Sequence, residues 1–354
     1  MRFLLDPEQR EFAASLHSML TAADTPSVVR DWSRGDHDSG RALWGRVAEA
    51  GVFALAVPEA YEGLGPRPAE LAVAFVELGR HAVPGPLVET VTAATLLAAL
   101  DDTGPAKRLL PALASGESVA TVTTGPYALD ADVADVRLAI SGAGERGLVA
   151  QFPAPLKGLR PPSGRRGSAP GEGTGRGGGG EKDPAGTPHP SLDPARRLFP
   201  TPHGGELLAT DPPLAPALLI ARLTTAAQAL GVGLALLDKT VSYVGQRTQF
   251  GAPIGSFQAV KHQLADVKVA LEFARPLVFG AALTMTREDV AAAKVTACEA
   301  AYRAARTALQ LHGAVGYTAE YDLSLWLTKA RALRTAWGSP DECRATVLSG
   351  GRRW

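Results

Sequence analysis

The sequence predicts a mostly α-helical protein with a small β domain near its middle. Apolar side chains recur at alternating steps of four and three residues in two neighbouring stretches, and this spacing aligns them on one face of a helix. The first stretch holds Leu230, Leu234, Leu237, Val241 and Val244, and the second holds Phe257, Val260, Leu264, Val267 and Leu271. Runs rich in β-branched residues, which are typical of strands, occur only after residue 117 and before about residue 210.

This distribution divides the chain of 354 residues, which is long enough to bury a large core, into three expected parts. An N-terminal helical domain is expected at residues 1–116. A reduced β domain is expected at residues 117–213, with a flexible glycine-rich loop at about 163–190. A C-terminal helical bundle of four helices is expected at residues 214–354.

Helix signals follow one another through the first part. Asp6-Pro7-Glu8-Gln9 combines a capping acid, a proline in the first turn and a following acid, which starts a helix well. A second helix is expected to end near Gly51, and a third to run from Pro68 to about Arg80. Pro84-Gly85-Pro86 then breaks the chain before a helix from Leu87 to Leu100.

The middle part changes to strand-like patterns and then to low complexity. Strands are expected at Ser118–Thr123 and Val136–Ile140. From Gly164 to Gly180, nine of 17 residues are glycine, and such a segment cannot offset its loss of conformational entropy by burial. We therefore expect a flexible excursion from a small β domain.

The last part returns to helices. A third long helix is expected from about Glu288 to Leu311, ending where Gly313 suits the C-terminal position of a helix. A final helical run reaches Trp337. The two periodic helices upstream are joined by a segment with Gly251, Pro253 and Gly255, which lets the chain reverse as an αα-hairpin.

Composition excludes several classes of protein. The 36 basic and 36 acidic residues balance, which argues against a nucleic-acid binder. Two cysteines favour a reduced chain over a disulfide scaffold, and no run of about 20 apolar residues suggests a membrane span. The sequence thus predicts a cytoplasmic protein. Its seven histidines show no ligand spacing, so we expect no metal.

The hairpin tip carries side chains that suit a flat, anionic ligand. Arg247 can pair with a pyrophosphate in a forked geometry, Phe250 can pack on a ring, and Gln249 and Gln258 offer amide groups. The alternative, a structural hairpin whose arginine is merely solvated, stays open on these residues alone.

The segment from Arg247 to Gln258, with the pattern Arg-x-x-Phe-Gly-x-Pro-Ile-x-x-Phe-Gln, resembles the flavin-contacting segment of the acyl-CoA dehydrogenase family. The order of helices, sheet and helical bundle is similar to that family as well. The resemblance implies FAD as cofactor, an acyl-CoA thioester as substrate, an electron-transfer acceptor and an oligomer. Members oxidise the Cα–Cβ bond: a glutamate removes the α-proton and the β-hydrogen leaves as hydride to FAD.

The resemblance also assigns roles to individual residues. Arg247 and Phe250 match residues that reach across to the FAD of a neighbouring subunit, and Gln258 matches a glutamine on its adenosine side. Gln310 and Gly313 match a Gln-x-x-Gly turn over the same flavin. Ser339 takes the place of a threonine near the isoalloxazine, and Arg222 that of an arginine that steadies the acyl-CoA.

The catalytic glutamate is missing from both positions at which the family carries it. Trp337 stands where most relatives have the glutamate, and Ala221 stands where a second group has it. Asp341 and Glu342 are close in sequence, but a helix would turn them away. The flavin-lining Thr-x-Pro-x-x-Gly-Ser-Asp loop is only faintly matched by Thr123-Thr124-Gly125-Pro126, and the Trp-x-Thr segment is absent.

This combination of retained and missing residues suggests one subunit of a heteromeric acyl-CoA dehydrogenase, similar to paired bacterial enzymes that act on bulky substrates such as steroid side chains. The partner would supply the glutamate. Two alternatives stay open: a self-sufficient homo-oligomeric dehydrogenase with a relocated base, and a non-catalytic family member that binds acyl-CoA or a protein partner.

Overall fold

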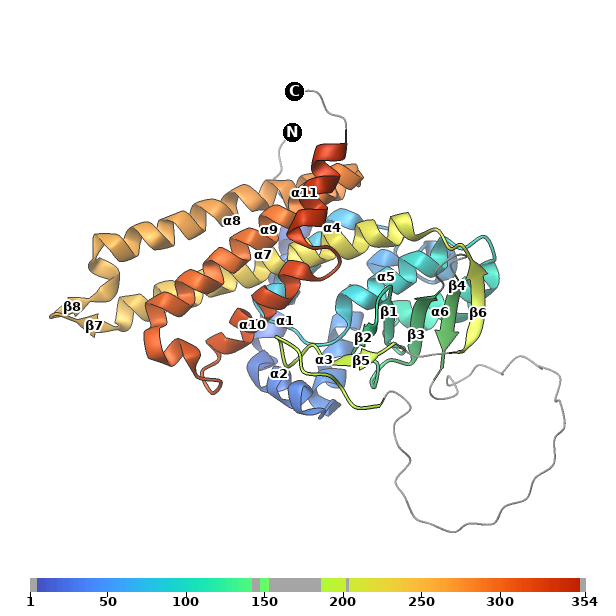
Figure 1. Cartoon of the computed structure of the whole chain (residues 1–354), viewed down its shortest axis with the longest axis horizontal. Coiled ribbons are helices and arrows are strands. Elements are labelled where there is room, and N and C mark those ends of the chain that lie inside the picture. The colour runs from blue at the N-terminus through green and yellow to red at the C-terminus, as the bar shows by residue number, and fades with distance from the viewer. Residues whose placement is uncertain (1–4, 142–146, 153–185, 202–203, 351–354) are drawn as a thin grey trace, which may run out of the picture.

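The computed structural model describes residues 5–141, 147–152, 186–201 and 204–350 (Figure 1). It confirms the predicted class, a mostly helical fold with a small central sheet. Most of the predicted glycine-rich loop lies outside the described residues. The helices of the N-terminal part are α1 (Pro7–Thr21), α2 (Thr25–Arg34), α3 (Asp38–Glu49), α4 (Pro68–Arg80), α5 (Leu87–Ala98) and α6 (Thr103–Ala114), with 3-10 turns at Ala54–Ala56 and Glu59–Tyr61.

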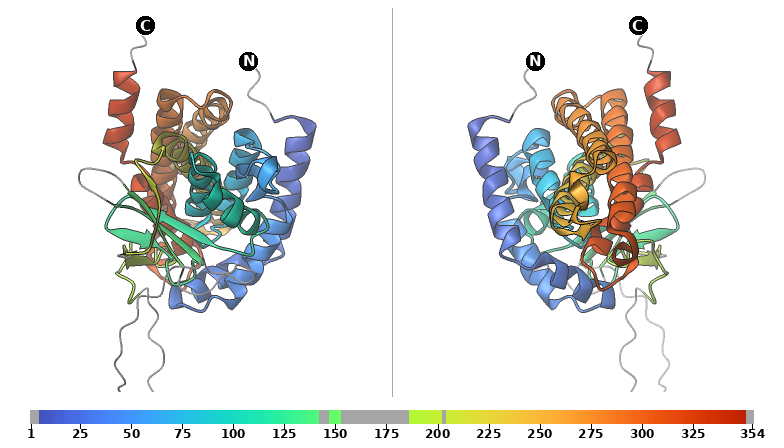
Figure 2. Two further views of the ribbon diagram at one scale, coloured as in Figure 1. Left: turned by 90° about the vertical axis from the view of Figure 1, so that its right-hand side faces the viewer. Right: turned by 90° about the vertical axis from the view of Figure 1, so that its left-hand side faces the viewer.

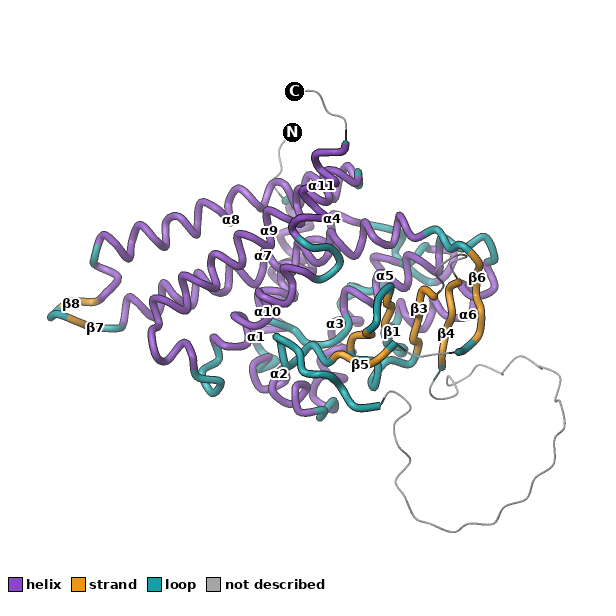
Figure 3. The backbone as a smooth tube through the Cα atoms, viewed as in Figure 1, coloured by secondary structure: helices purple, strands orange, loops and turns teal. Residues whose placement is uncertain are grey.

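The strands of the middle part form a four-stranded sheet and a separate two-stranded ribbon. The sheet has the order β1-β3-β4-β6; β1 and β3 are parallel, whereas β4 is antiparallel to both of its neighbours. In the ribbon β2 pairs antiparallel with β5. The strands are β1 (Ala120–Thr123), β2 (Tyr127–Leu129), β3 (Val136–Ser141), β4 (Gly147–Gln151), β5 (Leu198–Pro200) and β6 (Glu206–Thr210). Figure 3 shows these strands at one end of the molecule.

The C-terminal part is a bundle of long helices followed by a short last one. The helices are α7 (Leu214–Gln246), α8 (Gln258–Thr284), α9 (Arg287–His312), α10 (Leu323–Thr335) and α11 (Pro340–Ser349), with a 3-10 turn at Gly313–Tyr317. The final helical run, predicted to reach Trp337, is α10, which ends two residues before Trp337; a further helix, α11, follows it. Seen end-on, α1 and α11 lie on opposite flanks of the bundle (Figure 2).

Helix α7 is the central element of the fold and packs against α4, α5, α8, α9 and α10. It is long and apolar enough to cross a membrane by length and composition alone, which corrects the expectation that no such run exists. Because 78% of its most apolar window is buried inside the protein, it is typical of a core helix.

Helices α4 and α7 cross with their backbones in close contact. A Cβ atom added at Gly79 would collide with the carbonyl oxygen of Gln228, and one added at Gly231 would collide with that of Val76. Two glycines therefore allow an approach that any side chain would prevent. This contact fixes the N-terminal helices against the bundle.

The predicted hairpin between α7 and α8 is present, and its tip is more ordered than a simple turn. Two short antiparallel strands, β7 (Thr248–Gln249) and β8 (Ala252–Pro253), are followed by a 3-10 turn at Ile254–Ser256. In Figure 1 this tip projects from the end of the molecule that lies opposite the sheet.

Candidate functional site

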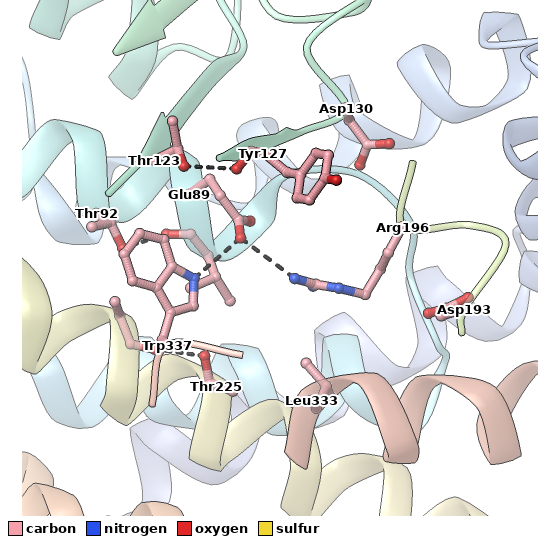
Figure 4. A network of polar contacts seen from close by, with 12 residues as sticks. Glu89, Thr92, Thr123, Tyr127, Asp130, Asp193, Arg196, Thr225, Leu333 and Trp337 are labelled. Carbon is pink, nitrogen blue, oxygen red and sulfur yellow. Dashed lines mark hydrogen bonds and ion pairs between the residues drawn. The ribbon is translucent and has the colours of Figure 1, made fainter. Parts of the chain in front are cut away.

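A cavity of about 440 Å³ lies where α5, the β1–β2 turn, α7 and the α10–α11 connection meet. Its walls combine apolar and polar side chains, among them Glu89, Thr123, Tyr127, Arg196, Arg222 and Trp337. Figure 4 shows Glu89, Arg196 and Trp337 pointing toward one another across this space. The cavity therefore collects groups from all three parts of the chain.

Trp337, the residue predicted from the sequence to stand at the glutamate position, lines the cavity (Figure 4). Its backbone has φ 58°, a left-handed conformation that is unusual for a bulky residue. Its indole Nε1–H donates a hydrogen bond of 3.1 Å to Glu89 Oε1. The Arg222 side chain donates to the Trp337 carbonyl oxygen at 3.0 Å. Strain of this kind persists only where surrounding contacts impose it, and these two bonds do so.

Glu89 is a residue of this site that the sequence analysis missed. Its side chain is buried, with the whole residue 3% exposed, and the Arg196 guanidinium lies 3.6 Å from the same Oε1 atom. Oε2 has no hydrogen-bond partner within the described part of the chain. The sequence did carry a signal, since Glu89 is the only charged residue of the apolar helix α5. A buried carboxylate oxygen without a partner calls for a functional explanation.

The two acidic residues that follow Trp337 have other roles. Ser339 caps α11: its hydroxyl group accepts from the Glu342 backbone N–H at 3.2 Å, and Glu342 Oε2 accepts from the Ser339 N–H at 2.6 Å. The Ser339 N–H holds the pKa of Glu342 below its usual value. Asp341 pairs with Arg344 at 3.0 Å on the surface. Glu342 lines the cavity edge, yet its carboxylate is engaged by the helix cap.

The hairpin tip presents the predicted flavin-contacting residues to solvent. Phe250 is 95% exposed and has φ 53°, and Arg247 and Gln258 are exposed beside it. The Arg247 carbonyl oxygen accepts from the Ile254 N–H at 2.8 Å, which holds the two sides of the tip together. An exposed apolar ring on a strained backbone costs free energy in an isolated chain. It is typical of a surface that contacts a ligand or another subunit.

Gln310 and Gly313 lie at the same end of the bundle as the tip. Gln310 lines a groove of about 1010 Å³ between α8 and α9, together with Arg303, Arg306, Phe273 and Tyr317. Gly313 ends α9 with φ 62°. The ring of Tyr243, near the end of α7, stacks on His312 with centroids 4.1 Å apart, so α7 and α9 end side by side.

The residues assigned from the sequence thus separate into two groups. Arg247, Phe250, Gln258, Gln310 and Gly313 gather at the end of the bundle, whereas Arg222 and Trp337 line the cavity and Ser339 follows its lining residue Gly338 in the chain. Ala221 is fully buried in α7 beside Arg222 and does not line the cavity.

The two groups of residues differ in how well they fit FAD. An exposed guanidinium, an exposed phenyl ring and an amide at the start of a helix fit a pyrophosphate and a ring system that approach from another subunit. The chain's own cavity fits less well. The Thr123 hydroxyl group already donates to the Tyr127 carbonyl oxygen at 2.7 Å within the turn, and the cavity has room for one small ring system or acyl group.

Comparisons with known proteins agree with this geometry. Residues 6–117 match the model of the acyl-CoA dehydrogenase N-terminal domain, and residues 215–349 match that of the C-terminal domain. The chain is 32% identical over 340 residues, 95% of each chain, to the acyl-CoA dehydrogenase IpdE2 of Mycobacterium tuberculosis.

Solved structures share the fold over nearly the whole chain. One is the ChsE4–ChsE5 complex from Mycobacterium tuberculosis, with a TM-score of 0.78, 22% identity and 100% of each chain covered. Another is the Tcur3481–Tcur3483 steroid ACAD, with a TM-score of 0.76, 24% identity and 96% of each chain covered. The chain therefore belongs to the acyl-CoA dehydrogenase family, oxidoreductases that act on the CH–CH bond of acyl-CoA thioesters.

Proposed function

We propose that this chain is one subunit of a heteromeric acyl-CoA dehydrogenase. A partner subunit supplies the catalytic glutamate and the flavin pocket, and this chain supplies Arg247, Phe250 and Gln310 to the partner's FAD. The observation that carries the proposal is the Trp337 indole, which lies in the cavity at the residue where the resemblance expects the base and donates to Glu89 at 3.1 Å. The exposed tip supports it, because the Phe250 ring is 95% exposed and so is free to contact another subunit.

The chemistry explains why the missing glutamate matters. The α-proton of a thioester is weakly acidic, so a carboxylate must lie within hydrogen-bond reach of it in a dry site. FAD, when bound, supplies the acceptor for the β-hydrogen. In this chain the indole of Trp337 cannot take a proton. This chain instead helps to orient the flavin of the partner: Arg247 pairs with a pyrophosphate and Phe250 packs on a ring.

The similar proteins support a partner and a bulky substrate. One structure of the same fold is a complex of two differently named chains, and another is described as a steroid ACAD. We propose that the acyl group here is likewise large and ring-containing. A cytoplasmic location and an electron-transfer acceptor for the reduced flavin complete the proposal.

The direct test is a flavin spectrum of the chain purified alone and again after co-expression with a family member encoded nearby that carries the glutamate. We expect flavin and activity only in the co-expressed complex. Bound FAD that is bleached by acyl-CoA in the chain alone would contradict the proposal. A complex that forms without flavin but still binds CoA thioesters would favour the non-catalytic binding role.

The tip residues give a sharper version of this test. Replacing Arg247 and Phe250 by Ala removes a guanidinium and a ring that the chain's own core does not use. We expect the complex to assemble and to lose most of its FAD, measured as the absorbance ratio of flavin to protein. The matched control is Arg10→Ala, which removes another exposed arginine, from α1. Equal flavin content in both variants would disprove the role of the tip.

A self-sufficient homo-oligomer is the second candidate, because Glu89 offers a carboxylate oxygen without a partner in the cavity. Glu89→Gln keeps the acceptor for Trp337 and removes the base. Under our proposal the complex keeps its turnover number (kcat) within a few-fold. If Glu89 were the base, the variant would lose about 100-fold or more. Replacing Asp341 and Glu342 by Ala is the parallel test of the bases considered from the sequence, and we expect no loss of chemistry there.

A further inference from the structure

Three potential metal ligands converge between α1 and α4, outside the cavity and outside the hairpin tip. His17 Nδ1 lies 3.1 Å from Glu77 Oε2 and 3.1 Å from His81 Nε2. One ligand atom from each of the three residues lies within 4.8 Å of the others. No role in the acyl-CoA dehydrogenase site explains this cluster.

The helix geometry fixes the arrangement. Glu77 lies in the last turn of α4 and His81 is the C-cap residue that follows it; the His81 N–H donates to the Glu77 carbonyl oxygen at 3.1 Å, which keeps the two residues on the same side of the helix end. His17 comes from α1, which is held against the core by the buried neighbours Leu16 and Leu20. Three ligands from two packed helices are therefore pre-positioned before any ion binds.

Hydrogen bonding alone does not satisfy this cluster. His17 Nδ1 can carry one hydrogen or one lone pair, yet it faces both the Glu77 carboxylate and the His81 ring nitrogen. If Nδ1 carries the hydrogen, both neighbours must share it. If Nδ1 carries the lone pair, it opposes the lone pairs of Glu77. A cation in the centre accepts a lone pair from each of the three groups at once.

The ligand set indicates which ion. Two imidazole nitrogens and one carboxylate oxygen are the borderline donors that zinc prefers, at bond lengths of about 2.0–2.2 Å. Tetrahedral ligands at such bond lengths are about 3.3 Å apart, close to the separations of 3.1 Å that join His17 to Glu77 and to His81. The remaining separation, between the Glu77 and His81 ligand atoms, is up to 4.8 Å, so these two side chains would move toward each other as the ion binds. The His17 side chain is 49% exposed, so a fourth position is open to water.

We propose that His17, Glu77 and His81 form a binding site for a divalent transition-metal ion, zinc first, which links α1 to α4. The neighbouring cations do not prevent this. Arg80 pairs with Asp238 at 2.8 Å, and the Lys239 ammonium group lies over the Trp326 ring at 4.1 Å. The spacing of histidines along the sequence predicted no metal, because spacing cannot show that α1 packs on α4.

The test uses the full chain, purified without a histidine tag, treated with EDTA and dialysed. Zinc chloride is titrated against a chromophoric chelator of known Kd. We expect about one zinc ion per chain. His17→Ala and His81→Ala should each weaken binding by more than the roughly 10- to 100-fold that loss of an outer-shell partner costs. Glu77→Gln should weaken it as well.

The matched control is His262→Ala, which removes an exposed histidine of α8 and should leave zinc affinity unchanged. Zinc should also raise the Tm of the native chain and not that of His17→Ala, since binding to the folded state stabilises it. His17 is half exposed, so this variant is expected to fold, which its circular dichroism spectrum checks. No zinc binding by the native chain, or an affinity in the His17→Ala and His81→Ala variants equal to that of the native chain, would overturn the proposal and indicate an adventitious ion only.

Discussion

Asp130 carries a carboxyl group that is removed from water inside the protein. Its Oδ1 accepts from the Trp32 indole at 3.1 Å and from the Arg197 backbone N–H at 3.2 Å, so it joins α2 to the chain leading into β5. Burial raises the pKa of Asp130 from 3.8 to about 8, although the Trp32 hydrogen bond opposes this. The folded chain therefore holds a proton that the unfolded chain releases at much lower pH.

This predicts a stability that falls as pH rises. Between about pH 4 and pH 8 the folded state binds more protons at Asp130 than the unfolded state, so the free energy of unfolding decreases across this window. Asp130→Asn keeps an acceptor and cannot ionise. We expect this variant to be more stable than the native chain at pH 8, by an amount on the order of a few kcal/mol, and to show a flatter pH dependence. Urea unfolding at pH 5 and pH 8 measures both, and a steeper dependence in the variant would contradict the assignment.

Single residues show what the sequence could and could not predict. The motif around Gly338-Ser339 directed attention to Trp337, which the structure places in the cavity wall, because the order of neighbouring residues is sufficient for that inference. Glu89 was missed, because its contact with Trp337 joins residues 248 positions apart. Asp130 was missed for the same reason: its meaning depends on burial, which only the folded chain defines.

At the scale of the element, α8 presents an apolar stripe to solvent. Val269, Phe273 and Leu277 are exposed at helical spacing, with Phe273 71% exposed at the wall of the α8–α9 groove. A stripe of this kind marks an association surface. We predict that Phe273→Glu prevents assembly with the partner while the chain itself stays folded.

Size-exclusion chromatography with light scattering measures this effect on the co-expressed chains. Leu64→Glu is the control, since it places the same charge on another exposed apolar residue, in the N-terminal part. Normal assembly of the Phe273→Glu variant would exclude this face of α8 as the interface.

Long helices and strands were predicted from the sequence more accurately than short ones. The long helices α7, α8 and α9 have several turns of periodicity and were all predicted; the observed bounds of α9 lie within one residue of the predicted ones, whereas α7 and α8 extend well beyond the apolar stripes that predicted them. β2, β5 and the tip strands β7 and β8 have two or three residues each, too few to show alternation, and they were missed. β4 and β6 are longer, but they flank the glycine-rich stretch, and pairing with β3 defines them more than composition does.

At the scale of the whole molecule, one buried ion pair joins regions that are distant in sequence. Lys329 of α10 lies 3.4 Å from Asp193, with both side chains almost fully buried, and its ammonium group also donates to the Val83 carbonyl oxygen at 3.5 Å. The Lys329 ammonium group therefore joins three regions: the bundle, the segment before β5 and the α4–α5 connection.

Lys329→Met should destabilise the protein by about 3–5 kcal/mol, because it leaves the Asp193 carboxylate buried without its partner. Combining it with Asp193→Asn should recover much of that loss. Urea unfolding of both variants measures the two free energies. A double variant as unstable as the single one would show that the packing of the lysine stem matters more than its charge.

Helix α7 sets a fixed distance between the two groups of site residues. At a rise of about 1.5 Å per residue, Arg222 and Arg247 lie about 37 Å apart along one continuous helix. Because α7 is continuous, it has no hinge that could bring both of its ends to the same flavin. In a two-fold pair with an unlike subunit, the partner's own hairpin tip would reach this chain's cavity, where Trp337 and Glu89 stand. If the heteromer proposed above holds no cofactor in this cavity, that tip is free to vary in sequence, and its divergence would be a signature by which the partner can be identified.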